Sequence, residues 1–171
     1  MRLRFARGFT LIEVLVALCV LAIGALGAAA MQLAAMRARH QSSLASDAVQ
    51  LAGSLADSMR ANRAAMAAGA NPYLIRYDAA ADGAPLASGP PCHAGAPCDA
   101  LQLAAAEVHQ FKQSLHAHYP GGRVVVCRDG AAELTWACDE AAAAPVIIKI
   151  GWRGAGTERP RVAVALPGAG G

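Results

Sequence analysis

The chain has 171 residues, a formal net charge of +3, and a composition that is 56% hydrophobic but only 5% aromatic. This length suits one small domain plus a long helix, and the few aromatic residues leave a modest soluble core that disulfides would help to stabilise. Arg2, Arg4 and Arg7 carry the whole excess of positive charge, so a chain without them is neutral. Neutrality argues against a strong general attraction to nucleic acid, while leaving room for a local basic patch.

The N-terminus combines a basic leader, a lone acid and a long apolar segment. Residues Val14 to Met31 are uninterruptedly apolar, which is long enough to cross a bilayer core as a helix. Glu13 lies at the start of this segment, where a carboxylate in lipid is costly and usually marks function. The segment therefore predicts a membrane helix with a functional acid at its head.

Two ordinary explanations cover part of this pattern. A secretory signal peptide would have a shorter apolar region and a small-residue cleavage site, which Ala28 to Ala30 imitate only loosely. A plain membrane anchor explains the apolar segment, and the leader arginines would hold the N-terminus in the cytoplasm. Neither explanation gives a reason for Glu13.

The hexapeptide Gly8-Phe9-Thr10-Leu11-Ile12-Glu13 resembles the type III signal of type IV pilins and of the pseudopilins of type II secretion. The resemblance implies that a membrane peptidase cleaves between Gly8 and Phe9 and methylates the new amine of Phe9. It also implies that Glu13 pairs with the N-terminal amine of the adjacent subunit and sets the axial register of a filament. A buried amine and a carboxylate that pair in this way offset each other's desolvation cost.

The helical pattern continues beyond the apolar segment. Apolar or small residues recur at spacings of three and four, which marks one face of a helix: Leu33, Met36, His40, Leu44, Ala48, Leu51, Leu55 and Met59. No proline occurs between Phe9 and Asn71, so we expect one helix of about 60 residues, roughly 90 Å long. The expected organisation is a cleaved leader at 1–8, a membrane and filament-core half at 9–36, and a globular domain at 37–171 that includes the helix to about residue 68. Gly24 and Gly27 would permit close helix approach or local unwinding.

Gly69 and Asn71-Pro72 are expected to end the long helix, and an irregular loop around Tyr73-Leu74-Ile75 follows to Cys98. A second helix begins after Asp99, an N-cap with Gln102 three residues on, and stops at Pro120-Gly121-Gly122. Its expected buried face is Leu101, Val108, Phe111, Leu115 and Tyr119.

Strand signals occupy the C-terminal third of the chain: Arg123 to Cys127, Glu133 to Cys138 after an Asp129-Gly130 turn, Pro145 to Trp152, and Arg161 to Leu166. Val146, Ile148, Ile150 and Trp152 alternate onto one face. Three or four antiparallel strands on the C-terminal half of the long helix make an α+β fold. This α/β-roll agrees with the type IV pilin fold that the resemblance implies.

Of the five cysteines, Cys19 lies within the apolar segment and is expected to be a small membrane-facing or helix-facing residue. Cys92, Cys98, Cys127 and Cys138 allow three connectivities. Proximity favours Cys92–Cys98 and Cys127–Cys138, and an oxidising periplasm favours disulfides. Zinc binding by Cys92 with His93 and the pair His116 and His118 is the alternative, although the spacing matches no standard zinc motif.

The sequence shows no nucleophile elbow, phosphate loop or metal-ligand helix, so we expect no catalytic residue, no metal and no cofactor. The histidines of the second helix, His109, His116 and His118, are expected to be surface residues. Arg60 and Arg63 lie one turn apart, on a solvated face or facing a partner's acid.

Several later segments resemble the PilV-type minor pilins, also called type IV pilus modification proteins: Asp57 to Arg63, Cys98 to Ala104, Pro120-Gly121-Gly122, and Val146 to Trp152 with Arg153. Where these relatives usually carry an acid and a tryptophan in the second helix, this chain has Glu107 and Phe111. The resemblance implies a low-abundance, non-enzymatic subunit that primes pilus assembly with other minor pilins and sits at the tip.

The partners that the resemblance implies are a prepilin peptidase, the major and other minor pilins, the inner-membrane assembly platform and membrane lipid. It places the chain in the inner membrane as a single-pass protein, with a cytoplasmic N-terminus and a periplasmic domain, and then in the pilus fibre. The alternatives are a minor pseudopilin of type II secretion, or an adhesin or DNA-binding pilin at the tip.

Overall fold

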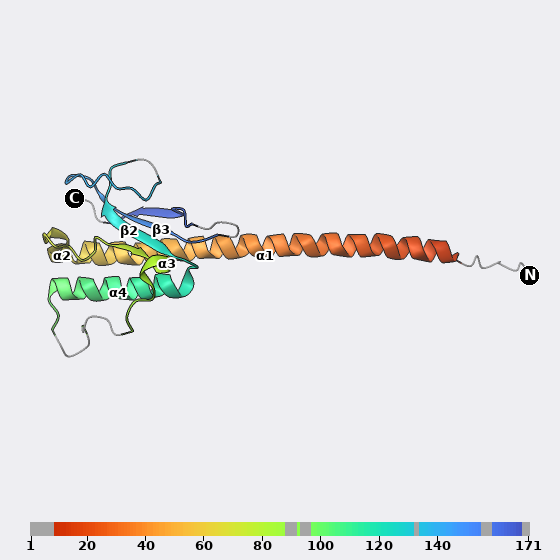
Figure 1. The fold of residues 1–171 in the computed structure, drawn as a ribbon, viewed down its shortest axis with the longest axis horizontal. Coiled ribbons are helices and arrows are strands. Elements are labelled where there is room, and N and C mark those ends of the chain that lie inside the picture. The colour runs from red at the N-terminus through yellow and green to blue at the C-terminus, as the bar shows by residue number, and fades with distance from the viewer. Residues whose placement is uncertain (1–8, 88–91, 93–96, 132–133, 155–158, 169–171) are drawn as a thin grey trace, which may run out of the picture. The chain divides into compact units, whose positions relative to one another are not determined.

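The computed structural model describes residues 9–87, 92, 97–131, 134–154 and 159–168. The chain divides into an N-terminal unit, Met1–Ser42, and a C-terminal unit, Ser43–Gly171. Helix α1, Leu11–Ala61, begins in the first unit and continues into the second (Figure 1). The remaining helices and all four strands belong to the C-terminal unit.

Helix α1 ends earlier than the sequence predicts. It stops at Ala61, and a separate short helix α2 occupies Arg63–Ala67, so the expected continuous helix to about residue 68 is wrong. Asn62 has φ −101° and ψ 64°, outside the helical region. Its side-chain oxygen accepts a hydrogen bond from the backbone N–H of Ala65 at 3.2 Å, and its amide donates to the carbonyl of Ala100 at 2.7 Å. Asparagine is a favoured N-cap, so a new helix begins after Asn62. Its hydrogen bond to Ala100 also connects this point to a second helix, which one continuous helix would not do.

The buried face of α1 in the C-terminal unit follows the predicted stripe and adds small residues to it. Leu44, Ala48, Leu55 and Met59 are buried as predicted. Ala52 and Ala56 are buried as well, so alanines at positions 48, 52 and 56 line one face at four-residue spacing and let other elements approach the helix closely. The three N-terminal residues of the predicted stripe, Leu33, Met36 and His40, are exposed.

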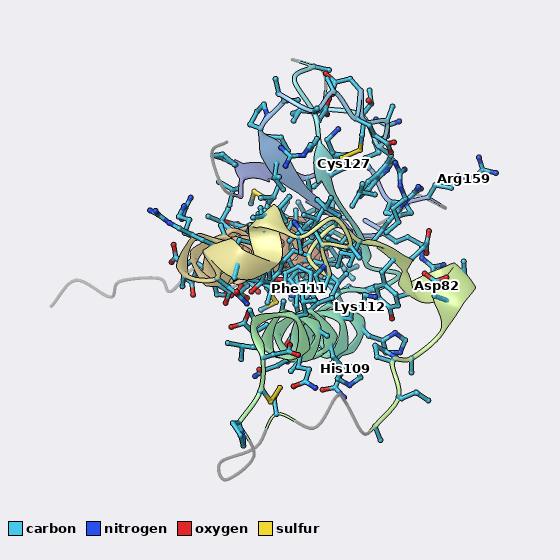
Figure 2. The ribbon with its side chains drawn as sticks, turned by 90° about the vertical axis from the view of Figure 1, so that its left-hand side faces the viewer. Asp82, His109, Phe111, Lys112, Cys127 and Arg159 are labelled. Carbon is cyan, nitrogen blue, oxygen red and sulfur yellow. A yellow bond between two sulfur atoms is a disulfide. The ribbon has the colours of Figure 1, made fainter. Side chains whose placement is uncertain are left out.

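Helix α4, Ala100–His118, begins with the predicted capping box, because Asp99 accepts from the N–H of Gln102 and the Gln102 side chain accepts from the N–H of Asp99. Val108, Phe111, Leu115 and Tyr119 are buried as predicted. Leu101 is 41% exposed, so its assignment to the core was wrong, and Ala104 is buried instead. Figure 2 shows Phe111 on the side of α4 that faces α1 and His109 on the opposite side.

The sheet has four antiparallel strands in the order β1-β2-β3-β4. Their bounds are Arg76–Asp78, Arg123–Arg128, Val146–Gly151 and Val164–Pro167. Two sequence predictions were wrong. The first strand lies in the segment predicted as an irregular loop, because Arg-Tyr-Asp is too short and polar to give a strand signal. Its pairing is extended by mutual backbone bonds between Ile75 and Val126.

The second wrong prediction is the strand at Glu133 to Cys138, of which the described part, 134–138, has no strand conformation. The backbone N–H of Asp129 bonds to the carbonyl of Pro145, so β2 leads directly into pairing with β3. The intervening residues form a loop over the sheet. A short helix α3, Ala79–Asp82, follows β1 and is capped by Asp78.

The core lies between the sheet and the two long helices, with α4 beside α1 and the sheet on the other side of α1 (Figure 1). Val146, Ile148, Ile150 and Trp152 are all buried, which confirms the predicted face of β3. Each fully buried aliphatic side chain of this kind contributes about 1.5–3 kcal/mol. The arrangement confirms the predicted α+β class.

Each edge strand has part of its outward backbone already bonded or blocked. At the β1 edge, the N–H of Leu74, two residues before the strand, bonds to the carbonyl of Asn71, and the N–H of Asp78 bonds to the carboxylate of Asp82 at 2.7 Å. On β4, Pro167 has no N–H, and its carbonyl accepts a hydrogen bond from Arg60 at 3.3 Å.

Candidate assembly segment

The head of α1 presents an acid that has no partner within its own described chain. Thr10 precedes the helix, and its hydroxyl accepts from the N–H of Glu13 at 3.4 Å, as an N-cap side chain does. Glu13 lies in the first turn, where the helix dipole favours a negative charge. None of the described residues forms a hydrogen bond or ion pair with its carboxylate, and Phe9 is 83% exposed. Gly8, the other residue of the predicted cleavage site, lies outside the described residues, as do the leader arginines.

The apolar segment behind Glu13 is fully exposed in the isolated chain. Within the part of the chain that the structure describes, α1 is the one helix long and apolar enough to cross a membrane, and its apolar window is not buried at all. Large side chains such as Leu21, Ile23 and Leu26 are about 70% exposed. So large an apolar surface needs lipid or other protein around it. A Cβ added at Gly24 or Gly27 would meet no atom within 4 Å, so another helix could approach closely there.

The C-terminal unit contains two disulfides, Cys92–Cys98 and Cys127–Cys138, the pairing that sequence proximity favours. With their thiols bonded to each other, neither pair offers a thiolate to zinc. His93 lies outside the described residues. Cys19 is a free, exposed thiol in the apolar segment.

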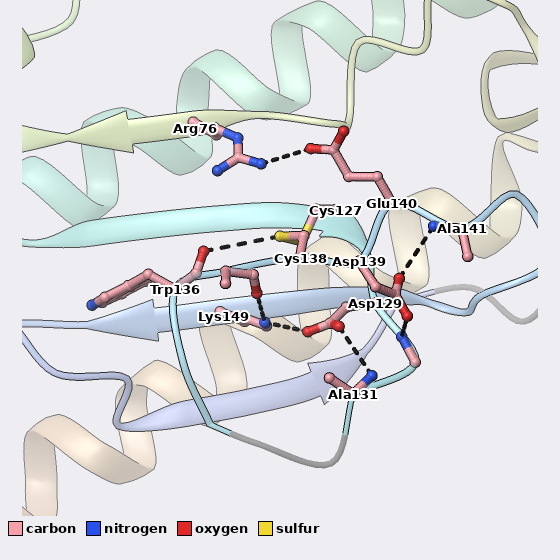
Figure 3. Close-up of polar contacts among 12 residues, drawn as sticks. Arg76, Cys127, Asp129, Ala131, Trp136, Cys138, Asp139, Glu140, Ala141 and Lys149 are labelled. Carbon is pink, nitrogen blue, oxygen red and sulfur yellow. Dashed lines mark hydrogen bonds and ion pairs between the residues drawn. A yellow bond between two sulfur atoms is a disulfide. The ribbon is translucent and has the colours of Figure 1, made fainter.

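The loop closed by Cys127–Cys138 covers a buried ion pair (Figure 3). Lys149 lies in the middle of β3 on the face opposite the core and donates hydrogen bonds to the carboxylate of Asp129 and the carbonyl of Ala137. Both side chains of the pair are 2% exposed. The hydrogen bond from Lys149, aided by the N–H of Ala131, holds the pKa of the Asp129 carboxyl below its usual range.

Sequence reasoning missed this pair, although one signal for it was present. Lys149 is a lone charge inside the strand Val-Ile-Ile-Lys-Ile. A buried lysine needs an acid, and Asp129 stands in the turn that follows the neighbouring strand.

A second buried polar contact joins the segment before β1 to α4. Tyr73 is fully buried, and its hydroxyl donates to the carboxylate of Glu107. Burial, together with this hydrogen bond, raises the pKa of the Tyr73 phenol. Glu107 thus acts in packing α4 against the rest of the unit.

The other singled-out residues have ordinary surface contacts. Arg60 pairs with Asp57 at 2.6 Å, one turn away on α1, and Arg63 is exposed. The Nδ1 atoms of His116 and His118 contact the hydroxyl of Tyr77 and the carbonyl of Ser114, both at 2.9 Å.

Two family models match the chain. Residues 3–29 match the prokaryotic N-terminal methylation motif, and residues 30–109 match the model described as type IV pilin Tt1218. Neither a curated protein nor a solved structure matches it. The methylation motif implies processing by a prepilin peptidase, and the long apolar helix with its small antiparallel sheet is the architecture of pilins. The chain belongs to the type IV pilin family.

Proposed function

We propose that this chain is a minor pilin of a type IV pilus that primes assembly with other minor pilins and sits at the pilus tip. The observation that carries the proposal is the head of α1, where an exposed apolar helix surface begins with a single unpartnered acid, Glu13. In a filament, that carboxylate pairs with the methylated amine of Phe9 on the adjacent subunit. This pairing offsets the free-energy cost of removing both the carboxylate and the amine from water.

The proposed processing places the cleavage between Gly8 and Phe9. The chain is first held in the inner membrane, with its N-terminus in the cytoplasm and its C-terminal unit in the periplasm, because the leader arginines favour that orientation. It then moves into the fibre through contacts with the assembly platform and other pilins. It performs no chemistry of its own.

The PilV-type assignment is supported by the segment Met59-Arg60-Ala61-Asn62-Arg63. In the structure Asn62 follows α1, and its two side-chain hydrogen bonds connect it to Ala65 of α2 and Ala100 of α4. A junction with that role gives a physical reason for the motif that resembles the minor pilins.

Deletion of the gene, followed by counting of surface pili, tests the proposal. We expect pili to be lost, wild-type chain to restore them, and Glu13→Ala to fail. Asp47→Ala serves as the matched control, because Asp47 is an exposed acid on the same helix outside both the apolar segment and the segment that resembles the minor pilins. Mass spectrometry of the membrane-extracted wild-type chain should give an N-methylated Phe9 terminus.

The same experiment separates the rival functions. Normal pili with impaired protein export would identify a type II pseudopilin. Normal pili with lost adhesion or DNA uptake would identify a binding module at the tip. An intact Met1 or a terminus near Ala30 would contradict the pilin processing itself.

A further inference from the structure

One end of the C-terminal unit gathers arginines from strand β2 and from the connection between β3 and β4. In the sheet register, Arg123 at the start of β2 stands opposite Gly151 at the end of β3. The carbonyl of Arg161 packs directly against Gly151, and the ring of Trp136 lies beside it. The Arg123 guanidinium lies 4.6 Å from the centre of the Trp136 ring. Residues far apart in sequence therefore meet where β2 begins and β3 ends.

The same end contains a hollow of about 350 Å³, lined by His116, His118 and Arg153 among others. The N–H of Arg153 bonds to the carbonyl of Pro120 at 2.9 Å, and its guanidinium packs on Gly121, whose φ of +55° turns the chain there. Both imidazoles use Nδ1 for the contacts given above. Within the described residues this leaves Nε2 of each for a ligand.

Three of these arginines have no acid partner among the described residues: Arg153, Arg159 and Arg161, all exposed. Figure 2 places Arg159 at the periphery of the unit. Arg123 differs, because the carboxylate of Asp78 lies 4.0 Å from it. The one acid between Gly154 and Arg161 is Glu158, outside the described residues. With Arg123, Arg153, Arg159 and Arg161 against Asp47, Asp78 and Asp82, the described residues of this end carry an excess of one positive charge, and we call it the basic end.

The basic end is also the end at which the chain enters the unit. Tyr119, which follows α4, packs on Trp152 with ring centres 5.3 Å apart. The pKa of Tyr119 is raised by burial and by the charge of Asp47, so Asp47 lies close to it. Asp47 is four residues past Ser43, the first residue of the unit.

Eleven residues, 32–42, separate Ser43 from Met31, the last residue of the apolar segment, and they include the exposed arginines Arg37 and Arg39. Such a stretch reaches at most about 40 Å when fully extended. A linker of this length allows this end of the unit to reach the lipid headgroups while the apolar segment is in a membrane.

We propose that the surface formed by Arg153, Arg159, Arg161, His116 and His118 binds the phosphate groups of anionic lipid headgroups while the subunit waits in the membrane. The inference rests on the proposed function, since it requires a membrane-held subunit. Arginine suits this ligand because its planar guanidinium forms paired hydrogen bonds with phosphate oxygens. Lipid is favoured over nucleic acid because the linker keeps this surface within reach of the membrane, whereas a chain without net charge lacks the long-range attraction that draws nucleic acid from solution.

The test uses the full-length chain in nanodiscs of phosphatidylcholine alone or with phosphatidylglycerol. Amide hydrogen exchange is followed in residues 119–123 and 151–154, with residues 62–68 as the reference segment. One arginine near an anionic surface shifts an equilibrium about fivefold, so we expect at least about fivefold slower exchange at this end in the anionic discs. The reference segment should exchange equally in both.

Matched variants assign the effect to these side chains. The triple variant Arg153→Gln/Arg159→Gln/Arg161→Gln should lose the protection, and Arg153→Lys/Arg159→Lys/Arg161→Lys should keep most of it. Arg60→Gln/Arg76→Gln/Arg128→Gln removes the same charge elsewhere in the unit, outside the reference segment, and should behave as wild type. Unchanged exchange in residues 62–68 verifies that each variant is folded.

Equal exchange in both kinds of disc would overturn the inference. So would protection in neutral discs by inorganic phosphate alone, which would indicate a site for a soluble anion. Protection by a short DNA duplex without protection by anionic lipid would assign the surface to nucleic acid. If the chain restores pili but exchanges equally in neutral and anionic discs, this inference is wrong and the proposed function stands. If the chain fails to enter the discs, both are wrong.

Discussion

Lys149, in the middle of β3, donates a hydrogen bond to Asp129, the residue that follows β2, on the face of the sheet that the helices do not cover. The loop that ends at Cys138 covers the pair, and the carbonyl of Ala137 in that loop accepts a second hydrogen bond from Lys149. The C-terminal unit thus has an apolar core on one side of the sheet and a charged, covered contact on the other.

The first prediction concerns this pair. Lys149→Met keeps most of the side-chain volume but leaves the Asp129 carboxylate without its cation. The double variant Lys149→Met/Asp129→Leu removes both charges. Because an unpaired charge is worse than an apolar replacement of the pair, we expect the single variant to be clearly less stable than the double in urea denaturation. Arg76→Met breaks the exposed Arg76–Glu140 pair and should change the free energy of unfolding by less than about 1 kcal/mol.

The second prediction concerns how the free energy of unfolding decreases at acidic pH. The folded-state pKa of Asp129 lies below that of an unfolded aspartate, about 3.9. The unfolded chain therefore takes up the proton first as the pH falls. The stabilisation by Asp129 is complete above the unfolded pKa and is lost as the pH drops through the folded pKa. Urea midpoints measured from pH 6 down to pH 2 should fall more steeply for wild type than for Lys149→Met/Asp129→Leu, and parallel curves would contradict the assignment.

The third prediction concerns the disulfide that closes the covering loop. Cys127 and Cys138 are 11 residues apart, and a closed loop of this size stabilises by about 3 kcal/mol through the entropy of the unfolded chain. Cys127→Ser/Cys138→Ser should lower the free energy of unfolding by that amount, measured under oxidising conditions. Dithiothreitol should destabilise this variant less than wild type. If the variant is as stable as wild type, packing of the loop alone keeps it over the Lys149–Asp129 pair.

The fourth prediction uses two neighbours on α1. Ala52 is fully buried, so Ala52→Leu overpacks the contact and should cost about 1–3 kcal/mol. A Cβ added at Gly53 would meet no atom within 4 Å, and Gly53→Ala should stabilise the helix by about 1 kcal/mol. Thermal unfolding followed by circular dichroism measures both. Effects of the same sign would show that the buried face of α1 is assigned wrongly.

Local patterns predicted most of the framework. The capping box at Asp99 and Gln102 and the alternating face of β3 have strong short-range signals, and the structure contains both. The break at Asn62 could not be predicted, because the asparagine gains from a contact with Ala100 that the local sequence does not contain. Strand β1 has three residues and exists only because β2 offers a partner.

The candidate site divides in the same way. Glu13 and the apolar segment can be identified from the sequence, because a charge beside an unbroken apolar run is conspicuous. Lys149 with Asp129, and Tyr73 with Glu107, depend on pairings across the fold. The arginines near Gly151 come from the start of β2 and from the connection that follows β3, which the sheet register brings together.

The bonded and blocked backbone groups at the two sheet edges affect how neighbouring subunits associate at high local concentration. Subunits packed at high local density would otherwise join edge to edge through their backbones, which is how strands begin to aggregate. The Leu74 and Asp78 amides are already bonded and Pro167 has no N–H, so a neighbouring domain meets an interrupted row of backbone groups, with Arg76 and Ala165 next to the blocked positions. Neighbours must then recognise each other through side chains, which differ from one subunit type to the next.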